Sequence, residues 1–232
     1  MEIATSDGMA HVGLTGPAAQ QPAIGVRGAG QAWDGRAAFL FVLTHGAGGG
    51  VEAPDLRAAR DAALRLGGAV AMVTQPYRVK GRRAPGAAAR QDAAWVEIIA
   101  ALRETARPES AAAGTPPAAG GPGIPLIQGG RSNGARVACR TARAVGARAV
   151  VALAFPLHPP GRPEQSRQAE LRETGADVLV VNGDRDPFGV PGVADATRVV
   201  VLAGESHALS RRPEAVGDAV GSWLRDVLAA AR

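Results

Sequence analysis

Ser132 lies at the centre of the sequence Gly130-Arg131-Ser132-Asn133-Gly134, and this spacing is typical of a serine that acts as a nucleophile. A serine hydroxyl is a poor nucleophile at neutral pH, so a protein that uses one exposes it on a sharp turn beside a general base. The two glycines permit that turn, because a Cβ at either position would collide with the neighbouring chain. The segment therefore predicts a nucleophile elbow between an apolar strand and a helix rich in small residues.

The acid and the base that such a serine requires follow it in the chain. An apolar run over residues 178–181 predicts a buried strand, and Asp184 and Asp186 lie in the turn after it. A second apolar run over residues 199–202 predicts another strand, and the loop after it contains His207. Glycine is abundant in this chain, with 31 residues, so the order serine, aspartate, histidine supports the motif more than the glycines do. We expect Ser132 to be the nucleophile, His207 the base, and one aspartate the group that orients it.

A glycine-rich loop follows another apolar strand, which is predicted over residues 39–43. Glycines let backbone N–H groups approach a substrate oxygen closely, as they do in an oxyanion hole. In this type of fold one N–H comes from such a loop and the other from the residue after the nucleophile. The expected donors are Ala47 or Gly48 together with Asn133. His45, in the same loop, is expected to fix the shape of the loop rather than to transfer protons.

These motifs, in this order, resemble those of the α/β-hydrolase superfamily, and in particular its compact, lid-poor bacterial members similar to dienelactone hydrolase. The resemblance covers roughly residues 37–232 and implies a mostly parallel sheet with helices on both faces. It also favours Asp186 over Asp184 as the orienting acid, with Asp184 stabilising the turn. One difference is that dienelactone hydrolase has a cysteine where this chain has Ser132, so a lactone substrate is not implied directly.

The order of the remaining elements agrees with this fold. Strand and helix patterns alternate after residue 37, which is typical of a parallel sheet covered on both faces. Only residues 157–176 occupy the place of a cap, so we expect a minimal cap. We predict a single domain over residues 1–232, with an edge hairpin around Asp7-Gly8 and a connection within residues 1–36. Residues 107–123 have no apolar periodicity and predict a mobile loop.

Composition argues against several other classes of protein. No run of residues is long and apolar enough to cross a bilayer, and the first residues show no targeting signal. Cys139 is the only cysteine, which is consistent with a reducing compartment, so we expect a cytoplasmic protein without a membrane partner. The net charge is +5, but the arginines are scattered and aromatic residues make up only 3%. We therefore expect no nucleic-acid partner.

Neither a metal nor another cofactor is expected. Histidines, the cysteine and the carboxylates show no metal-ligand spacing. The glycine-rich loop lacks the Gly-Lys-Ser/Thr sequence of a phosphate-binding loop, and the next predicted strand ends in Thr74-Gln75-Pro76, without the acid of a dinucleotide-binding fold.

The rim of the expected site contains a basic loop over residues 75–85. One interpretation is a substrate rim, in which Tyr77 offers an aromatic face and Arg78, Arg82 and Arg83 recognise a carboxylate or phosphate. The alternative is an ordinary solvated loop. His158 could line the site in the same way, or be a turn residue between prolines.

The sequence predicts a serine hydrolase that cleaves an ester, a thioester or a lactone through an acyl-serine intermediate. Its partner would be a small acyl substrate. The alternative is a non-catalytic binding or scaffold protein on the same fold, against which a complete set of catalytic residues argues.

Overall fold

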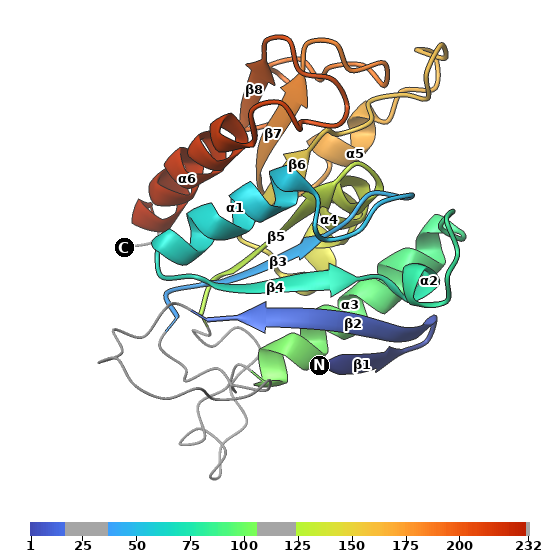
Figure 1. Cartoon of the computed structure of the whole chain (residues 1–232), viewed down its shortest axis with the longest axis vertical. Coiled ribbons are helices and arrows are strands. Elements are labelled where there is room, and N and C mark those ends of the chain that lie inside the picture. The colour runs from blue at the N-terminus through green and yellow to red at the C-terminus, as the bar shows by residue number, and fades with distance from the viewer. Residues whose placement is uncertain (17–36, 106–123, 231–232) are drawn as a thin grey trace.

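The computed structural model describes residues 1–16, 37–105 and 124–230, which form one eight-stranded sheet with helices on both faces (Figure 1). The strand order is β1-β2-β4-β3-β5-β6-β7-β8. The strands are β1 Glu2–Thr5, β2 Gly8–Thr15, β3 Leu40–Thr44, β4 Ala69–Thr74, β5 Leu126–Arg131, β6 Ala149–Leu153, β7 Asp177–Gly183 and β8 Arg198–Leu202. The helices are α1 Pro54–Arg65, α2 Pro76–Val79, α3 Ala88–Thr105, α4 Asn133–Val145, α5 Gln168–Arg172 and α6 Pro213–Ala229.

Strands β4, β3, β5, β6, β7 and β8 run parallel to their neighbours. Strands β1 and β2 form an antiparallel hairpin at one edge, and β2 also pairs antiparallel with β4. The hairpin turns at Asp7-Gly8, where the sequence predicts a tight turn. Strands β3 and β6 are buried along their whole length, because helices cover both faces of a parallel sheet. The carboxyl ends of β3, β5, β7 and β8 lie at the same edge of the sheet, which is where ligands bind in folds of this kind.

Two helix layers cover the sheet (Figure 1). Helices α1 and α6 lie together on one face, where Trp223 of α6 and Leu56 of α1 belong to the same apolar cluster as Phe41 of β3. Helices α3 and α4 lie on the other face, where Trp95 packs in a cluster with Val137 and Val42. Few aromatic residues take part, so alanine, valine and leucine fill most of the core, as the composition predicts.

The expected elements are present, with two additions inside predicted loops. A short helix, α2, begins at Pro76, where the fixed φ of proline favours the first turn of a helix. Another short helix, α5, lies within residues 157–176, which otherwise form the minimal cap. The connection predicted between residues 17 and 36 and the mobile loop predicted over residues 107–123 lie outside the described residues. None of the described helices is long and apolar enough to span a membrane.

The turn from β5 into α4 depends on the absence of two side chains. A Cβ on Gly130 would lie 2.7 Å from the carbonyl oxygen of Thr44, and a Cβ on Gly134 would lie 2.7 Å from that of His45. Both neighbours are backbone atoms at the end of β3, which cannot rotate away. The close approach of β3, β5 and α4 at this edge therefore requires glycine at both positions.

We predict that Gly134→Ala lowers the free energy of unfolding by about 1–3 kcal/mol, the usual cost of an added methyl in a packed core. Gly13→Ala is the matched control, because a Cβ on Gly13 meets no atom within 4 Å. Urea denaturation followed by circular dichroism measures both variants. A Gly134→Ala protein as stable as Gly13→Ala would contradict the close contact.

Candidate active site

Ser132 occupies a strained backbone conformation at the junction of β5 and α4. Its φ is 53° and its ψ is −113°, a region that residues with a side chain rarely adopt. The amide of Ser132 donates a hydrogen bond of 2.9 Å to the carbonyl of Leu153 on β6. The helix α4 begins at the next residue, so the serine side chain is held at the carboxyl edge of the sheet.

His207 reaches Ser132 from the loop that follows β8. The Nε2 atom of His207 lies 2.9 Å from Ser132 Oγ, and its Nδ1 atom lies 2.8 Å from Asp186 Oδ2. A carboxylate only accepts hydrogen bonds, so Nδ1 carries the proton and Nε2 accepts the serine O–H. The ring of Phe188 packs on the imidazole with centroids 4.2 Å apart, which limits rotation of the ring.

Asp186 is fixed from two further directions. Its side chain is completely buried, and its Oδ1 accepts the amide of Phe188 at 2.9 Å. The Oδ2 atom also accepts the side-chain amide of Asn182, at 3.2 Å. Sequence reasoning does not identify Asn182, a buried residue of β7 that also donates to Phe155 and Gly189. These contacts leave the carboxylate one orientation, toward His207.

Asp184 has a different environment from Asp186. It is exposed, and its Oδ1 accepts the amide of Gly204 at 2.7 Å. Gly204 belongs to the loop that carries His207. The contact joins the turn after β7 to the loop after β8. It is a structural role of the kind expected for Asp184 from the sequence.

Three backbone N–H groups near Ser132 are without an acceptor among the described residues, namely those of Ala47, Gly48 and Asn133. Asn133 is the first residue of α4, so its N–H has no intrahelical acceptor. The glycine-rich loop adjoins the nucleophile, because a Cβ on Gly46 would lie 3.2 Å from Ser132 Cβ. The arrangement offers donors of the kind that stabilise an oxyanion.

Buried side chains hold the glycine-rich loop in shape. Tyr77 donates its hydroxyl proton to the carbonyl of Ala47 at 3.2 Å. His45 Nε2 accepts the amide of Gln75 at 3.0 Å, so its Nδ1 carries the proton and donates to the carbonyl of Gly46 at 2.9 Å. Burial lowers the pKa of His45 from its ordinary value, which keeps the ring neutral.

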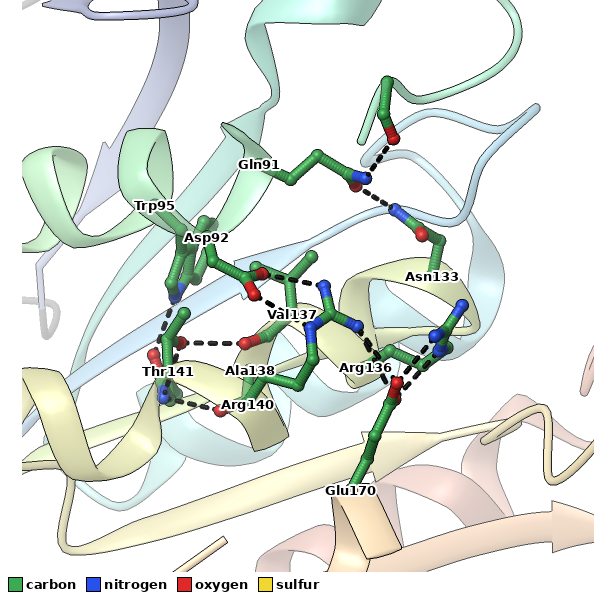
Figure 2. Close-up of polar contacts among 12 residues, drawn as sticks. Gln91, Asp92, Trp95, Asn133, Arg136, Val137, Ala138, Arg140, Thr141 and Glu170 are labelled. Atoms are coloured by element: carbon green, nitrogen blue, oxygen red, sulfur yellow. Dashed lines mark hydrogen bonds and ion pairs between the residues drawn. The ribbon is translucent and has the colours of Figure 1, made fainter. Parts of the chain in front are cut away.

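Asn133 is tied to helix α3 through its side chain (Figure 2). Its Nδ2 donates to Gln91 Oε1 at 2.8 Å, and Gln91 Nε2 in turn donates to the carbonyl of Gly86 at 2.9 Å. Gln91 is 42 residues from Asn133 in the chain, and the sequence contains no signal for it. The chain of hydrogen bonds orders the end of the basic loop against the start of α4.

Two arginines of α4 form separate ion pairs with the neighbouring helices (Figure 2). Arg140 makes a two-point contact with Asp92 of α3, at 2.7 and 2.9 Å. Arg136 makes another with Glu170 of α5, at 2.6 and 2.8 Å. Partly buried two-point pairs of this kind fix orientation as well as position. Helix α4 is therefore held between α3 and the minimal cap.

Arg131, the residue before the nucleophile, also has buried partners. Its Nη2 donates to the carbonyl of His207 at 2.9 Å. Its Nε lies 3.1 Å from Asp55 Oδ2, an ion pair without a well-directed hydrogen bond. Burial raises the pKa of Asp55 to about 6, against the opposing effects of Arg131 and the Leu56 amide. Neither residue is identified as functional by its sequence pattern.

The residues expected at the rim differ in position. Tyr77 is buried, with 3% of its surface exposed, so the expected aromatic face is wrong: the ring supports the glycine-rich loop instead. Arg82 and Arg83 are exposed, and Arg78, half-buried, donates to the carbonyl of Arg82 at 3.1 Å. His158 lies against Gly189, and its Nδ1 contacts the carbonyl of Pro159 at 2.8 Å. It therefore packs on the loop that carries Asp186.

No group of three His, Cys, Asp or Glu side chains within residues 1–16, 37–105 and 124–230 is arranged to hold a metal ion. An open groove of about 450 Å³ lies beside the β1–β2 hairpin, and none of the candidate-site residues of this section line it.

A family model described as "Alpha/beta hydrolase domain" matches residues 37–215. No curated protein sequence matches the chain. Among solved structures, the fold is similar to Est1E of Butyrivibrio proteoclasticus, which was determined with ferulic acid bound. The TM-score is 0.72 and the identity 15%, over 99% of both chains.

Two further structures have the same fold. One is XC6422 of Xanthomonas campestris, described as an α/β serine hydrolase without a lid, with a TM-score of 0.66, 18% identity, and 97% of this chain and 93% of that chain covered. The other is dienelactone hydrolase of Anabaena variabilis, with a TM-score of 0.65, 17% identity, and 97% and 95% covered. These likenesses confirm the predicted fold class, and the family model confirms the predicted superfamily.

We predict that Asp186→Asn slows the reaction of Ser132 with a fluorophosphonate by on the order of a thousandfold, because an amide can also donate and then favours the wrong imidazole tautomer. Asp184→Asn should change the rate less than about threefold, since its amide oxygen can still accept the Gly204 N–H. Time-resolved labelling followed by intact-protein mass spectrometry measures both. Equal losses would exchange the roles of the two aspartates.

Proposed function

Because the chain belongs to the alpha/beta hydrolase domain family, we propose that it hydrolyses an ester, a thioester or a lactone through an acyl-serine intermediate on Ser132. The observation that supports this most is the unbroken series of hydrogen bonds from Asp186 through His207 to Ser132, of 2.8 and 2.9 Å. The series ends at a serine in a strained turn, a conformation that persists only where the surrounding structure enforces it.

The first half of the reaction forms the acyl-serine. His207 Nε2 removes the Ser132 hydroxyl proton as Oγ attacks the carbonyl carbon of the substrate. The carbonyl oxygen becomes negatively charged, and the N–H groups of Asn133 and of Ala47 or Gly48 stabilise it. The imidazolium then gives its proton to the leaving group, and the carbon–heteroatom bond breaks. Asp186 remains ionised throughout and stabilises the imidazolium.

The second half releases the acid. A water molecule, activated by His207 Nε2, attacks the acyl carbon, and the same N–H groups stabilise the second oxyanion. The proton returns from His207 to Ser132 Oγ as the acyl bond to serine breaks. Apart from the substrate and water, every group in these steps belongs to the protein, so the proposed reaction requires no cofactor.

We predict that Ser132→Ala lowers the hydrolysis of a short activated ester by on the order of a thousandfold or more while the fold is retained. Fluorophosphonate treatment should add one label to the wild-type protein, at Ser132, and none to the variant. Peptide mapping by mass spectrometry identifies the labelled residue, and circular dichroism verifies the fold. Turnover that persists in Ser132→Ala, or a wild-type protein that is never labelled, would contradict the proposal and favour a non-catalytic role.

The basic rim supplies a proposal about specificity. Gln91 connects Gly86, at the end of the basic loop, to Asn133, so the exposed Arg82 and Arg83 belong to a segment that adjoins the nucleophile turn. A guanidinium in this place would attract an acyl group that carries a negative charge. The small number of residues in the cap argues for an open cleft and against long-chain lipids.

We predict that a hemisuccinate ester is hydrolysed with a higher kcat/KM than a neutral ester of the same length, and that 0.5 M NaCl reduces the difference because exposed charges are screened. Arg82→Ser combined with Arg83→Ser should remove the preference and leave the neutral ester unaffected. Arg65→Ser, on the far end of α1, is the control. Equal treatment of both esters by the wild-type protein would show an ordinary solvated loop.

A further inference from the structure

Arg131 lies where three segments of the site meet. Its Nη2 donates to the backbone carbonyl of His207, its Nε pairs with Asp55 at the start of α1, and its Nη1 lies 3.3 Å from the place of a Cβ on Gly46. Only 18% of the side chain is exposed, and that of Asp55 is completely buried. Burying an arginine costs desolvation free energy, which its ion pair and hydrogen bonds must offset.

We propose that Arg131, held by Asp55, is a positioning residue for His207: its guanidinium fixes the backbone carbonyl of the base at hydrogen-bond distance from the strand end that carries Ser132. The role rests on the function proposed above, since it matters for catalysis only if His207 acts as the base.

The loop around His207 has no regular secondary structure, so its position depends on contacts such as that of Arg131. Residues 203–212 connect β8 to α6, and Leu209 within them has a φ of 46°. A charge-assisted hydrogen bond from a planar guanidinium constrains both distance and direction. Arg131 also adjoins Ser132 in sequence, so one rigid strand end holds the nucleophile directly and the base through Arg131.

Asp55 completes the arrangement in two ways. It pairs with the guanidinium at Nε, next to the Nη2 that donates to His207, and its Oδ1 accepts the amide of Leu56 at 2.9 Å. Its charge also balances that of Arg131. The pair can therefore lie beside the imidazolium that forms during catalysis without adding a net positive charge.

Four ionised groups surround His207 and decide how its environment responds to substitution. Asp186 contacts its Nδ1, Arg131 its carbonyl, and Asp55 lies behind Arg131. Glu205, two residues earlier, is buried and accepts the amides of Arg211 and Arg212 on the α6 side. Removal of Asp55 alone leaves the Arg131 charge unbalanced and disfavours the imidazolium. Removal of Arg131 alone has the opposite sign.

Arg131→Lys tests whether one side chain must reach both Asp55 and the His207 carbonyl, because an ammonium keeps the charge beside Asp55 but presents no fork that spans both partners. We expect kcat for a short activated ester, and the rate of fluorophosphonate labelling, to fall about 10- to 100-fold, the scale of a small misplacement of a catalytic group. KM should change less than about twofold. Arg140→Lys is the matched control: the Arg140 side chain is paired with an aspartate and has a similar exposure, 17%, but touches no residue of the proposed mechanism, so its kcat should equal that of the wild type.

Asp55→Asn tests the charge balance. The midpoint of the acid limb in the pH profile of kcat/KM should move to lower pH, because the variant lacks the carboxylate that balances the guanidinium above about pH 6, the pKa of Asp55, and imidazolium formation becomes less favourable. The double variant Asp55→Asn with Arg131→Met removes both charges, which avoids an isolated buried charge and favours folding. It should restore the midpoint but not kcat, since the His207 carbonyl remains without its donor.

The outcomes separate the two proposals. A wild-type protein that reacts with the fluorophosphonate, together with Arg131→Lys at full kcat or at the same loss as Arg140→Lys, would overturn the positioning role and leave the proposed function intact. Full restoration of kcat in the double variant would reduce the pair to a structural ion pair. A wild-type protein without labelling or turnover would overturn the proposed function, and the positioning role with it.

Discussion

The left-handed backbone of Ser132 is the constraint on which the rest of the site depends. A residue with a side chain adopts this conformation at a cost of about 1–3 kcal/mol, and it does so here because β5 stops at Arg131 and α4 begins at Asn133 without an intervening loop. The turn is possible only because Gly130 and Gly134 allow the end of β3 to lie against it. The tight turn that strains the serine backbone therefore also places the glycine-rich loop beside it.

Irregular loops surround this rigid turn, and side chains from neighbouring elements and turns anchor them. The loop of His207 is fixed by Arg131 of β5 and by the contact between Asp184 and Gly204. The glycine-rich loop is fixed by Tyr77 of α2. The parallel sheet gives these loops a common edge, but hydrogen bonds from particular side chains determine the positions of the atoms within it. Functional groups on loops reach catalytic distances only when a scaffold holds them in this way.

The sequence could predict the fold, and the residues brought together at the turn, because both follow from local patterns. Apolar runs and glycines mark the strands and turns, and the order of Ser132, Asp186 and His207 follows a known motif. Arg131 and Gln91 could not be found this way, since each has a partner far away in the chain: Arg131 and His207 are 76 residues apart, and Gln91 and Asn133 are 42 apart. Asn182 lies only four residues before Asp186, but no local pattern marks their side-chain contact. Tyr77 was placed wrongly for a related reason. A proline before it predicts a turn, but whether the ring points outward or under the loop depends on the packing of β3 and α2.

Arg131, Ser132 and Asn133 are consecutive, and their side chains connect one turn to three parts of the site. Side chains alternate between the faces of a strand, so Arg131 at the end of β5 points to the α1 and α6 face, where it meets Asp55 and the loop of His207. Ser132 is turned out at the edge toward the His207 imidazole. Asn133, the first residue of α4, points to the other face and contacts Gln91 of α3. A displacement of the turn would therefore move the base, the nucleophile and the N–H of Asn133 together, which makes the turn more than a support for the serine.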